Sequence, residues 1–153
     1  MIFNNANKFD DSEHETLMAI WWTGIMLRSE ARKFFADKPA SDTQFNVMMV
    51  LKYADHLLTQ QELSRHLLVD QSNLTGLVDR MEKAGFLTRQ KVEYDRRCYH
   101  LKLTNKGREF VDEVEAPYRA LVKKIMAVFS AQEMAELTSL MMRLQNGLDE
   151  MNN

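Results

Sequence analysis

The chain has 153 residues, of which 45% are hydrophobic and 27% charged, and this is typical of one soluble globular domain. The lone Cys98 excludes an internal disulfide, and no N-terminal stretch resembles a signal peptide, so we expect a cytoplasmic protein. No apolar run is long enough to span a bilayer. The net charge of -2 argues against a uniformly basic nucleic-acid binder. Residues 59–107 nevertheless carry a net charge of +3, against -2 for residues 1–58 and -3 for residues 108–153, so an anionic partner is attracted to the middle of the chain.

The first predicted helix runs from Ser12 to about Ala36 and begins with a capping box in which Ser12 and Glu15 stand three residues apart. Its apolar residues cover too much of the circumference for one buried stripe, so the helix needs one partner in its own domain and another elsewhere. These residues are Leu17, Ile20, Trp21, Trp22, Ile25, Met26, Leu27, Phe34 and Phe35.

A central helix is predicted after Pro39, which breaks the chain. Ser41 and Gln44 form a capping box that opens it, and it spans about Asp42 to Ala54. Apolar residues lie on nearly every side of this helix, so we expect it to be surrounded by other elements.

A short helix and a polar-faced helix come next. Thr59 and Glu62 form a capping box for the short helix, which ends near Leu68. The stretch from Asp70 to Gly85 is predicted to be the second helix, with an aspartate to cap its start and a glycine to end it. Its apolar stripe is Leu74, Leu77, Val78 and Met81. Small and polar residues occupy the remaining positions: Gln71, Ser72, Asn73, Thr75, Gly76 and Arg80.

Beyond Gly85 the period changes from helical to alternating. This pattern predicts strands at 86–92 and 97–104, joined by a turn at 93–96, and together they form a hairpin with a basic tip. The side chains expected to face inward from the second strand are Tyr99, Leu101 and Leu103.

Two long helices complete the chain. Thr104 caps one that runs to about Phe129, and Pro117 in its interior predicts a kink or a break. Ser130 and Glu133 supply the capping box of the last helix. The last helix has a coiled-coil-like seam, which requires another helix against it: Met134, Leu137, Met141, Leu144 and Leu148.

The order of short helix, polar-faced helix and basic hairpin is that of a winged helix-turn-helix, in a chain that is otherwise mainly α. In such a fold the second helix enters the major groove of DNA and reads base edges. Asn73 and Gln71 offer paired donors and acceptors suited to adenine, and Arg65 and Arg80 suit phosphates. Further candidates for contact with bases or phosphates are Ser72, Thr75 and Gly76.

The hairpin tip is the candidate wing. Arg96 and Arg97 could enter the minor groove, whose negative potential attracts guanidinium groups. DNA would repel Asp95, so we expect this carboxylate to orient an arginine. A solvated charged turn is the alternative interpretation of the same residues.

The run LTQQELSRHLLVDQSNLTGLVDRMEKAGFLTRQ, followed by EYDRRCYHLKLTNKG, resembles the MarR family of transcriptional regulators. The resemblance implies a two-fold dimer formed by the first and last helices, with control by a small ligand or by oxidation. It also implies that 70–85 is the recognition helix, that Asp95 and Arg97 are the matched wing pair, and that Arg97 enters the minor groove. The corresponding domains are 39–107 for DNA binding and 1–38 with 108–153 for dimerisation.

Two residues depart from the family pattern. Many members have a basic residue where this chain has Gly76, and a glycine inside a helix costs about 1 kcal/mol relative to alanine. Either a close approach to DNA is required there or the position is relaxed. The reactive cysteine of the family's peroxide sensors lies in the first helix, whereas Cys98 lies on a wing strand, where an inert thiol is the better interpretation.

A small phenolic or other aromatic effector is a second hypothesis, because aromatic and methionine side chains adapt to apolar ligands. The plain alternative is that the same residues pack in the core and the dimer. The residues that could line such a pocket are Trp21, Trp22, Met26, Met48 and Met49.

Enzymatic function fits the sequence poorly. No phosphate loop or nucleophile motif is present, and the four histidines have no ligand-type spacing, so no cofactor or metal is predicted. We therefore expect a homodimeric DNA-binding regulator, by family habit a repressor, that reads a pseudo-palindromic operator. The alternative is a winged-helix protein-interaction module that does not read DNA.

Overall fold

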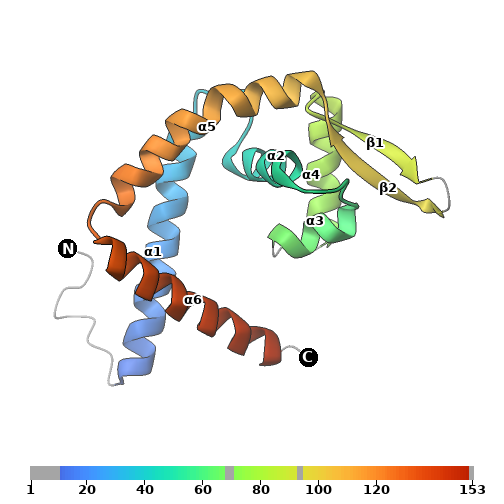
Figure 1. Ribbon diagram of the computed structural model, residues 1–153. Coiled ribbons are helices and arrows are strands. Elements are labelled where there is room, and N and C mark those ends of the chain that lie inside the picture. The colour runs from blue at the N-terminus through green and yellow to red at the C-terminus, as the bar shows by residue number, and fades with distance from the viewer. Residues whose placement is uncertain (1–10, 68–70, 93–94, 152–153) are drawn as a thin grey trace. The chain divides into compact units, whose positions relative to one another are not determined.

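The computed structural model contains six helices and one antiparallel hairpin in the part of the chain that it describes (Figure 1). This confirms the predicted class, mainly α with a small β-hairpin. The description covers residues 11–67, 71–92 and 95–151, except for the side chains of Gln71, Val92 and residues 95–98. The elements are α1 (Ser12–Phe35), α2 (Asp42–Tyr53), α3 (Gln60–Leu67), α4 (Gln71–Lys83), β1 (Leu87–Val92), β2 (Asp95–Leu103), α5 (Asn105–Met126) and α6 (Ala131–Met151).

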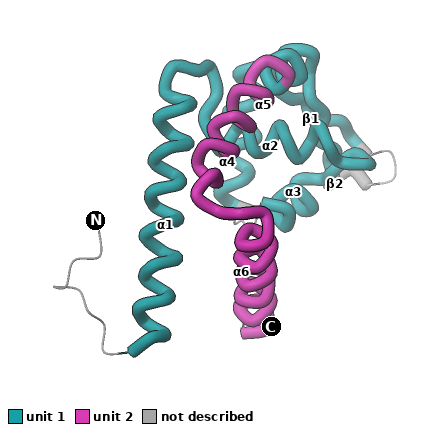
Figure 2. The backbone as a smooth tube through the Cα atoms, turned by 60° about the vertical axis from the view of Figure 1, so that its left-hand side comes forward, with its two compact units in different colours: residues 1–111 teal, residues 112–153 magenta. Residues whose placement is uncertain are grey.

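The chain forms two compact units, residues 1–111 and residues 112–153 (Figure 2). The first unit holds α1 to α4, the hairpin and the first turns of α5. The second unit holds the rest of α5 and all of α6. The boundary therefore lies within a helix, not in a linker.

Four phenylalanines form the aromatic part of the core in the first unit. The ring centroids are 5.2 Å apart for Phe35 and Phe45, 6.4 Å for Phe45 and Phe110, and 5.6 Å for Phe86 and Phe110. All four residues are buried. Tilted and edge-on pairs at these distances stabilise beyond the area they bury. The rings thus connect the end of α1, the start of α2, the residue before β1 and the first turns of α5.

Three of the predicted capping boxes are present. Ser41 and Gln44 bond reciprocally at the start of α2. The Thr59 and Glu62 pair opens α3, and the Ser130 and Glu133 pair opens α6. Each box satisfies backbone N–H groups that a helix start leaves without partners.

The box predicted from Ser12 and Glu15 is wrong. Asp11 caps α1 instead, since its carboxylate accepts a hydrogen bond from the backbone N–H of His14. Ser12 becomes the first helical residue, and its hydroxyl donates to Glu13 Oε2 over 3.0 Å. A carboxylate one residue earlier is the stronger acceptor near the positive end of a helix, so it displaces the hydroxyl.

The hairpin differs from the prediction in its turn and in one side chain. β2 begins at Asp95, which pairs with Val92, so the second strand starts two residues earlier than expected. Leu101 and Leu103 are buried as predicted, but Tyr99 is 37% exposed. Tyr99 pairs with Lys91, next to a register irregularity in β1, and the strand has passed the edge of the core at that point.

Of the kink or break predicted at Pro117, the break is wrong, because α5 continues from Asn105 to Met126 with the proline inside it, and the kink stays a prediction. The helix ends before Phe129, whose backbone N–H donates to the carbonyl of Met126 over 3.1 Å. In α6 no described residue is buried. Its exposed large apolar residues are Leu140, Met142, Leu144, Leu148 and Met151.

Candidate nucleic-acid interface

The helix α4 has the two faces that its sequence pattern predicts. Leu74, Val78 and Met81 are fully buried, and Leu77 is half-buried. On the other side, Ser72, Asn73, Thr75 and Arg80 are exposed, and Gly76 is half-buried. Asp70 and the side chain of Gln71 lie outside the described residues. The apolar face therefore anchors α4 and leaves its N-terminal polar groups open to a partner.

The helix α3 packs against α4 through both apolar and polar contacts. Leu63 of α3 is fully buried. Gln60 Nε2 donates a hydrogen bond to Thr75 Oγ1 over 2.6 Å, a contact that the sequence pattern did not predict. Arg65 lies on the exposed side of α3. The two helices are thus held together close to the residues predicted to read bases.

A hollow of about 500 Å³ lies beside the N-terminal half of α4. The start of α2 contributes Ser41 and Thr43 to its lining, and α4 contributes residues that include Ser72, Asn73, Gly76 and Arg80. No pattern in the sequence predicts that α2 contributes to this surface. Hydroxyl, amide and guanidinium groups therefore surround one concave site on the exposed side of α4.

Gly76 is not required by packing within the protein. A methyl group built on it would lie 3.5 Å from Arg80 Nη1, which is an ordinary van der Waals distance. Its φ angle is not in the left-handed region either. Among the described residues, nothing therefore prevents an alanine at this position.

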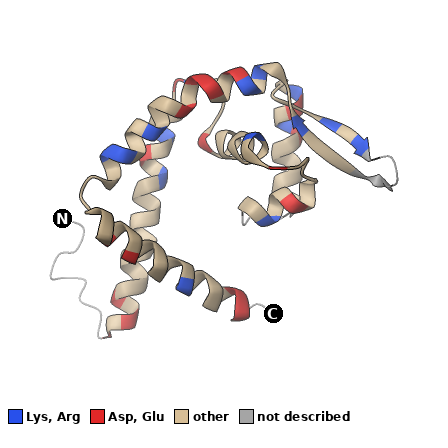
Figure 3. Ribbon diagram, in the orientation of Figure 1, with Lys and Arg blue, Asp and Glu red and all other residues tan. Residues whose placement is uncertain are grey.

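The hairpin is attached at its base to the segment before α3. The Leu101 N–H donates to the carbonyl of Leu58 over 2.8 Å, and Thr59 forms an isolated bridge with His100. Basic residues lie on α3, α4 and both strands (Figure 3). The side chains of the predicted wing residues Asp95, Arg96 and Arg97, and that of Cys98, lie outside the described residues.

An arginine on β1 bonds to two carboxylates on α4. Arg89 Nη2 lies 2.6 Å from Asp79 Oδ1, and Arg89 Nη1 lies 2.6 Å from Glu82 Oε2. The backbone N–H of Arg89 also donates to Glu82 Oε1 over 3.0 Å. Burial lowers the pKa of Arg89, but the hydrogen bonds and charges of Asp79 and Glu82 outweigh it and raise that pKa. No sequence motif predicts this group of three residues.

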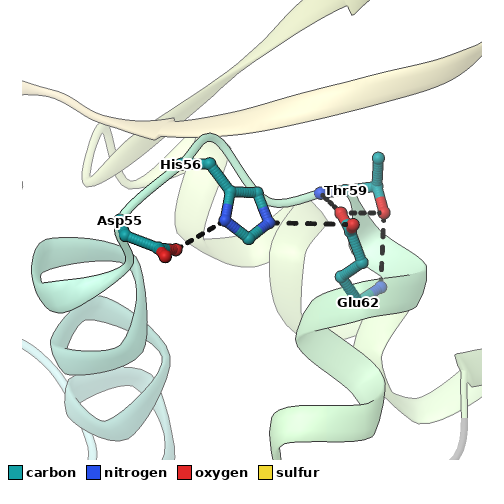
Figure 4. A network of polar contacts seen from close by, with 4 residues as sticks. All are labelled: Asp55, His56, Thr59 and Glu62. Carbon is teal, nitrogen blue, oxygen red and sulfur yellow. Dashed lines mark hydrogen bonds and ion pairs between the residues drawn. The ribbon is translucent and has the colours of Figure 1, made fainter.

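Four polar residues fix the entry to α3 (Figure 4). His56 Nδ1 lies 2.6 Å from Asp55 Oδ1, and His56 Nε2 lies 3.8 Å from Glu62 Oε1. The bond to Asp55 is the main cause that raises the pKa of His56 and lowers that of Asp55. Hydrogen bonds from Thr59 lower the pKa of Glu62. Beside them, His56, Glu62, Arg65 and His66 line a hollow of about 310 Å³.

The C-terminal end of α4 is bonded to the start of α5. Gly85 has a φ angle of 77°, the left-handed conformation that the sequence predicted for it. Thr104 Oγ1 donates to the Gly85 carbonyl over 2.6 Å, and Lys106 Nζ donates to the Ala84 carbonyl over 2.7 Å. A Cβ atom on Gly107 would lie only 2.2 Å from the Phe86 carbonyl oxygen. The segment LTNKG thus holds the end of the polar-faced helix.

The structure does not give the five candidate effector residues one common environment. Met48 is fully buried in the core, whereas Trp21 is 64% and Met26 52% exposed. Trp22 and Met49 are half-buried. An effector pocket at these residues therefore stays a prediction.

The described residues form neither a metal-binding cluster nor a membrane-spanning helix. No group of three or more His, Cys, Asp or Glu side chains among them could hold a metal ion. None of the helices that they form is long and apolar enough to cross a membrane.

Comparisons with known proteins agree with this geometry. The model of the MarR family matches residues 40–99. The transcriptional repressor MprA of Escherichia coli strain K12 is 29% identical over 153 residues, and the match covers 94% of this chain and 87% of MprA. AbsC, a MarR family transcriptional regulator from Streptomyces coelicolor, has a TM-score of 0.85 at 18% identity, covering 94% of this chain and 99% of AbsC. The structure of an S. aureus MepR-DNA complex has a TM-score of 0.79 at 14% identity, and the match covers 86% of this chain and 96% of the MepR chain. These likenesses confirm the predicted winged-helix fold.

Proposed function

Because the chain belongs to the MarR family of DNA-binding transcriptional regulators, we propose that it is a homodimeric repressor that reads a pseudo-palindromic operator. One observation carries the proposal. Leu74, Val78 and Met81 of α4 are fully buried, while the polar residues Ser72, Asn73 and Thr75 in its N-terminal half are exposed. A helix of this kind has the shape and chemistry to lie in the major groove of B-DNA.

The proposed contacts fall into two classes. Asn73 and Gln71 would read adenine by paired hydrogen bonds. Arg65 and Arg80 would contact phosphates, which position the protein and carry no sequence information. Additional contacts from α4 would come from Ser72, Thr75 and Gly76.

The wing would add a second groove. Arg97, oriented by Asp95, would enter the minor groove next to the site that α4 reads, and Arg96 would lie beside it. Arginine favours this position because the narrow minor groove concentrates negative potential. The likeness to the MepR-DNA complex supports DNA as the partner.

Dimerisation would use residues 1–38 and 108–153. In α1, Leu17, Trp21 and Ile25 are all more than half exposed, and α6 exposes a row of apolar residues. Apolar side chains exposed along a helix mark an interface. With two recognition helices per dimer, we expect half-sites about 10 bp apart, centre to centre.

Selection of bound sequences from random duplex DNA tests this function. We expect enrichment of an inverted repeat and a protein–DNA complex that contains two copies of the chain on one duplex. A matched scrambled duplex is the control, because non-specific binding rests on phosphate contacts and loses affinity steeply with salt. Equal retention of both duplexes at moderate salt, or binding to a protein partner without any DNA shift at low salt, would leave a protein-interaction module as the better assignment.

A small aromatic effector would relieve repression. Titrating phenolic acids while following tryptophan fluorescence and operator affinity tests this part. We expect the fluorescence of Trp21 and Trp22 to change and operator affinity to fall over the same concentration range, because one binding event would cause both. If fluorescence changed without any change in DNA affinity, the ligand would not be a regulator.

A further inference from the structure

The contact between Arg89 and α4 is directional and partly shielded from water. The side chain of Arg89 is only 21% exposed, and its two outer nitrogens bind two different carboxylates. By contrast, the pair between Arg119 and Glu115 on α5 is a single bond whose arginine is 65% exposed. Exposed pairs contribute little, whereas charge-assisted bonds held in a fork fix geometry as well as energy.

The two carboxylates lie on one side of α4. Asp79 and Glu82 are three residues apart, which places them on neighbouring turns of the same helix face. Bonds to two turns from one planar guanidinium restrain rotation of α4 about its own axis. The apolar contacts below the helix are non-directional, so they restrain its rotation less strictly.

Arg89 is poorly suited to contact DNA itself. Two carboxylates face its single positive charge, so the group as a whole is negative and would be repelled by phosphates. Its backbone N–H is also already bonded to Glu82. Any effect of Arg89 on DNA binding therefore passes through the helix that it holds.

We propose that Arg89 is a positioning residue of the DNA-binding site. It couples the hairpin to the recognition helix, so that Asn73 in the major groove and the wing in the minor groove meet one duplex in register. This inference rests on the proposed function. Part of the sequence specificity would then come from the angle between α4 and the hairpin, in addition to the part that comes from residues in contact with bases.

The test compares Arg89→Lys with Arg119→Lys in the full chain. Lysine keeps the positive charge but cannot span both carboxylates in one plane. Affinity is measured for the selected operator and for a scrambled duplex over a range of salt concentrations. Circular dichroism at the same temperature confirms that each variant is folded.

For Arg89→Lys we expect operator affinity to fall by about tenfold, with affinity for the scrambled duplex and the salt slope unchanged. Arg119→Lys should bind like the wild type. A folded Arg89→Lys variant with an unchanged ratio of operator to scrambled affinity overturns the proposal. A salt slope that is lower by about one unit overturns it as well, because Arg89 would then contact a phosphate directly.

Two more variants test whether Arg89 acts through its bond to Asp79 and not through a general loss of folding. Asp79→Asn should lower the same affinity ratio, and the double variant Arg89→Lys with Asp79→Asn should lose no more than either single variant. Additive losses would mean that the two residues act independently and would overturn the proposal. If the wild type itself did not prefer the selected operator, the proposed function would fail. If the wild type preferred the operator and Arg89→Lys preferred it equally, only the role proposed for Arg89 would fail.

Discussion

Gly107→Ala should destabilise the protein although the glycine lies in a helix. The added Cβ would lie 2.2 Å from the Phe86 carbonyl oxygen and 3.1 Å from its carbonyl carbon, so one of the two segments must move by roughly 1 Å to relieve the overlap. The Phe86 backbone resists this movement, because its N–H donates to Met81 over 2.9 Å and its carbonyl accepts from Thr104 over 3.1 Å. Overpacking of this kind costs about 1–3 kcal/mol, partly offset by a helix-propensity gain of up to about 1 kcal/mol.

Gly76→Ala is the matched control for this substitution. Its Cβ would meet only Arg80 Nη1, at 3.5 Å, so the propensity gain of about 1 kcal/mol should appear without a steric cost. Urea unfolding at one fixed protein concentration compares both variants with the wild type, because self-association would make the measured stability depend on concentration. A Gly107→Ala variant as stable as Gly76→Ala would refute the steric argument.

Gly76→Ala also separates two interpretations of this position. If α4 must approach DNA closely there, the variant will be more stable than the wild type but will bind the operator less tightly. If the position is relaxed, stability will rise and operator affinity will stay the same. Fluorescence anisotropy with labelled operator distinguishes these results.

Three further outcomes are expected. Asn73→Ala should relax sequence preference and leave scrambled-duplex affinity unchanged, with exposed Asn46→Ala as the control in competition assays. Equal losses on all duplexes would remove its base-reading role. Arg97→Ala should reduce the log–log salt slope by about one unit in titrations, and an unchanged slope would contradict the wing assignment. The pKa of His56 is raised above its ordinary 6.5, so its stabilising contribution is complete below that value and is lost as pH rises through the raised pKa. NMR titration should show this pKa falling in Asp55→Asn, and an unchanged value would contradict the pairing.

Local features were the part of the fold that the sequence predicted well. The capping box at Ser41, for example, depends on residues three positions apart, and the stripe from Leu74 to Met81 follows the helical period. Such patterns need no knowledge of the rest of the chain. The capping box predicted at Ser12 is absent for a local reason too. Asp11 is a competing N-cap, although Ser12 and Glu15 have the spacing of a capping box.

Contacts between elements were beyond the pattern. Arg89 bonds residues seven and ten positions earlier, across the turn that ends α4, and no periodicity specifies such a partner. The bond from Gln60 to Thr75 is of the same kind. The prediction that Tyr99 faces inward was wrong, because an alternating pattern gives the face of a strand but not the point where the core beneath it ends. The roles of Asp95, Arg96 and Arg97 stay predictions, because their side chains lie outside the described residues.

The bonds from Thr104 and Lys106 to the end of α4 set the C-terminal limit of a segment that could be exchanged with a related protein. In a host without the same threonine and lysine, a graft of the proposed DNA-reading segment that stopped at Leu103 would leave the carbonyls of Ala84 and Gly85 without the donors that hold them. It would also place a foreign residue where Gly107 leaves room for the Phe86 carbonyl. The exchangeable cassette must therefore include the first turn of α5, and a chimera built to change operator choice should be joined after Gly107.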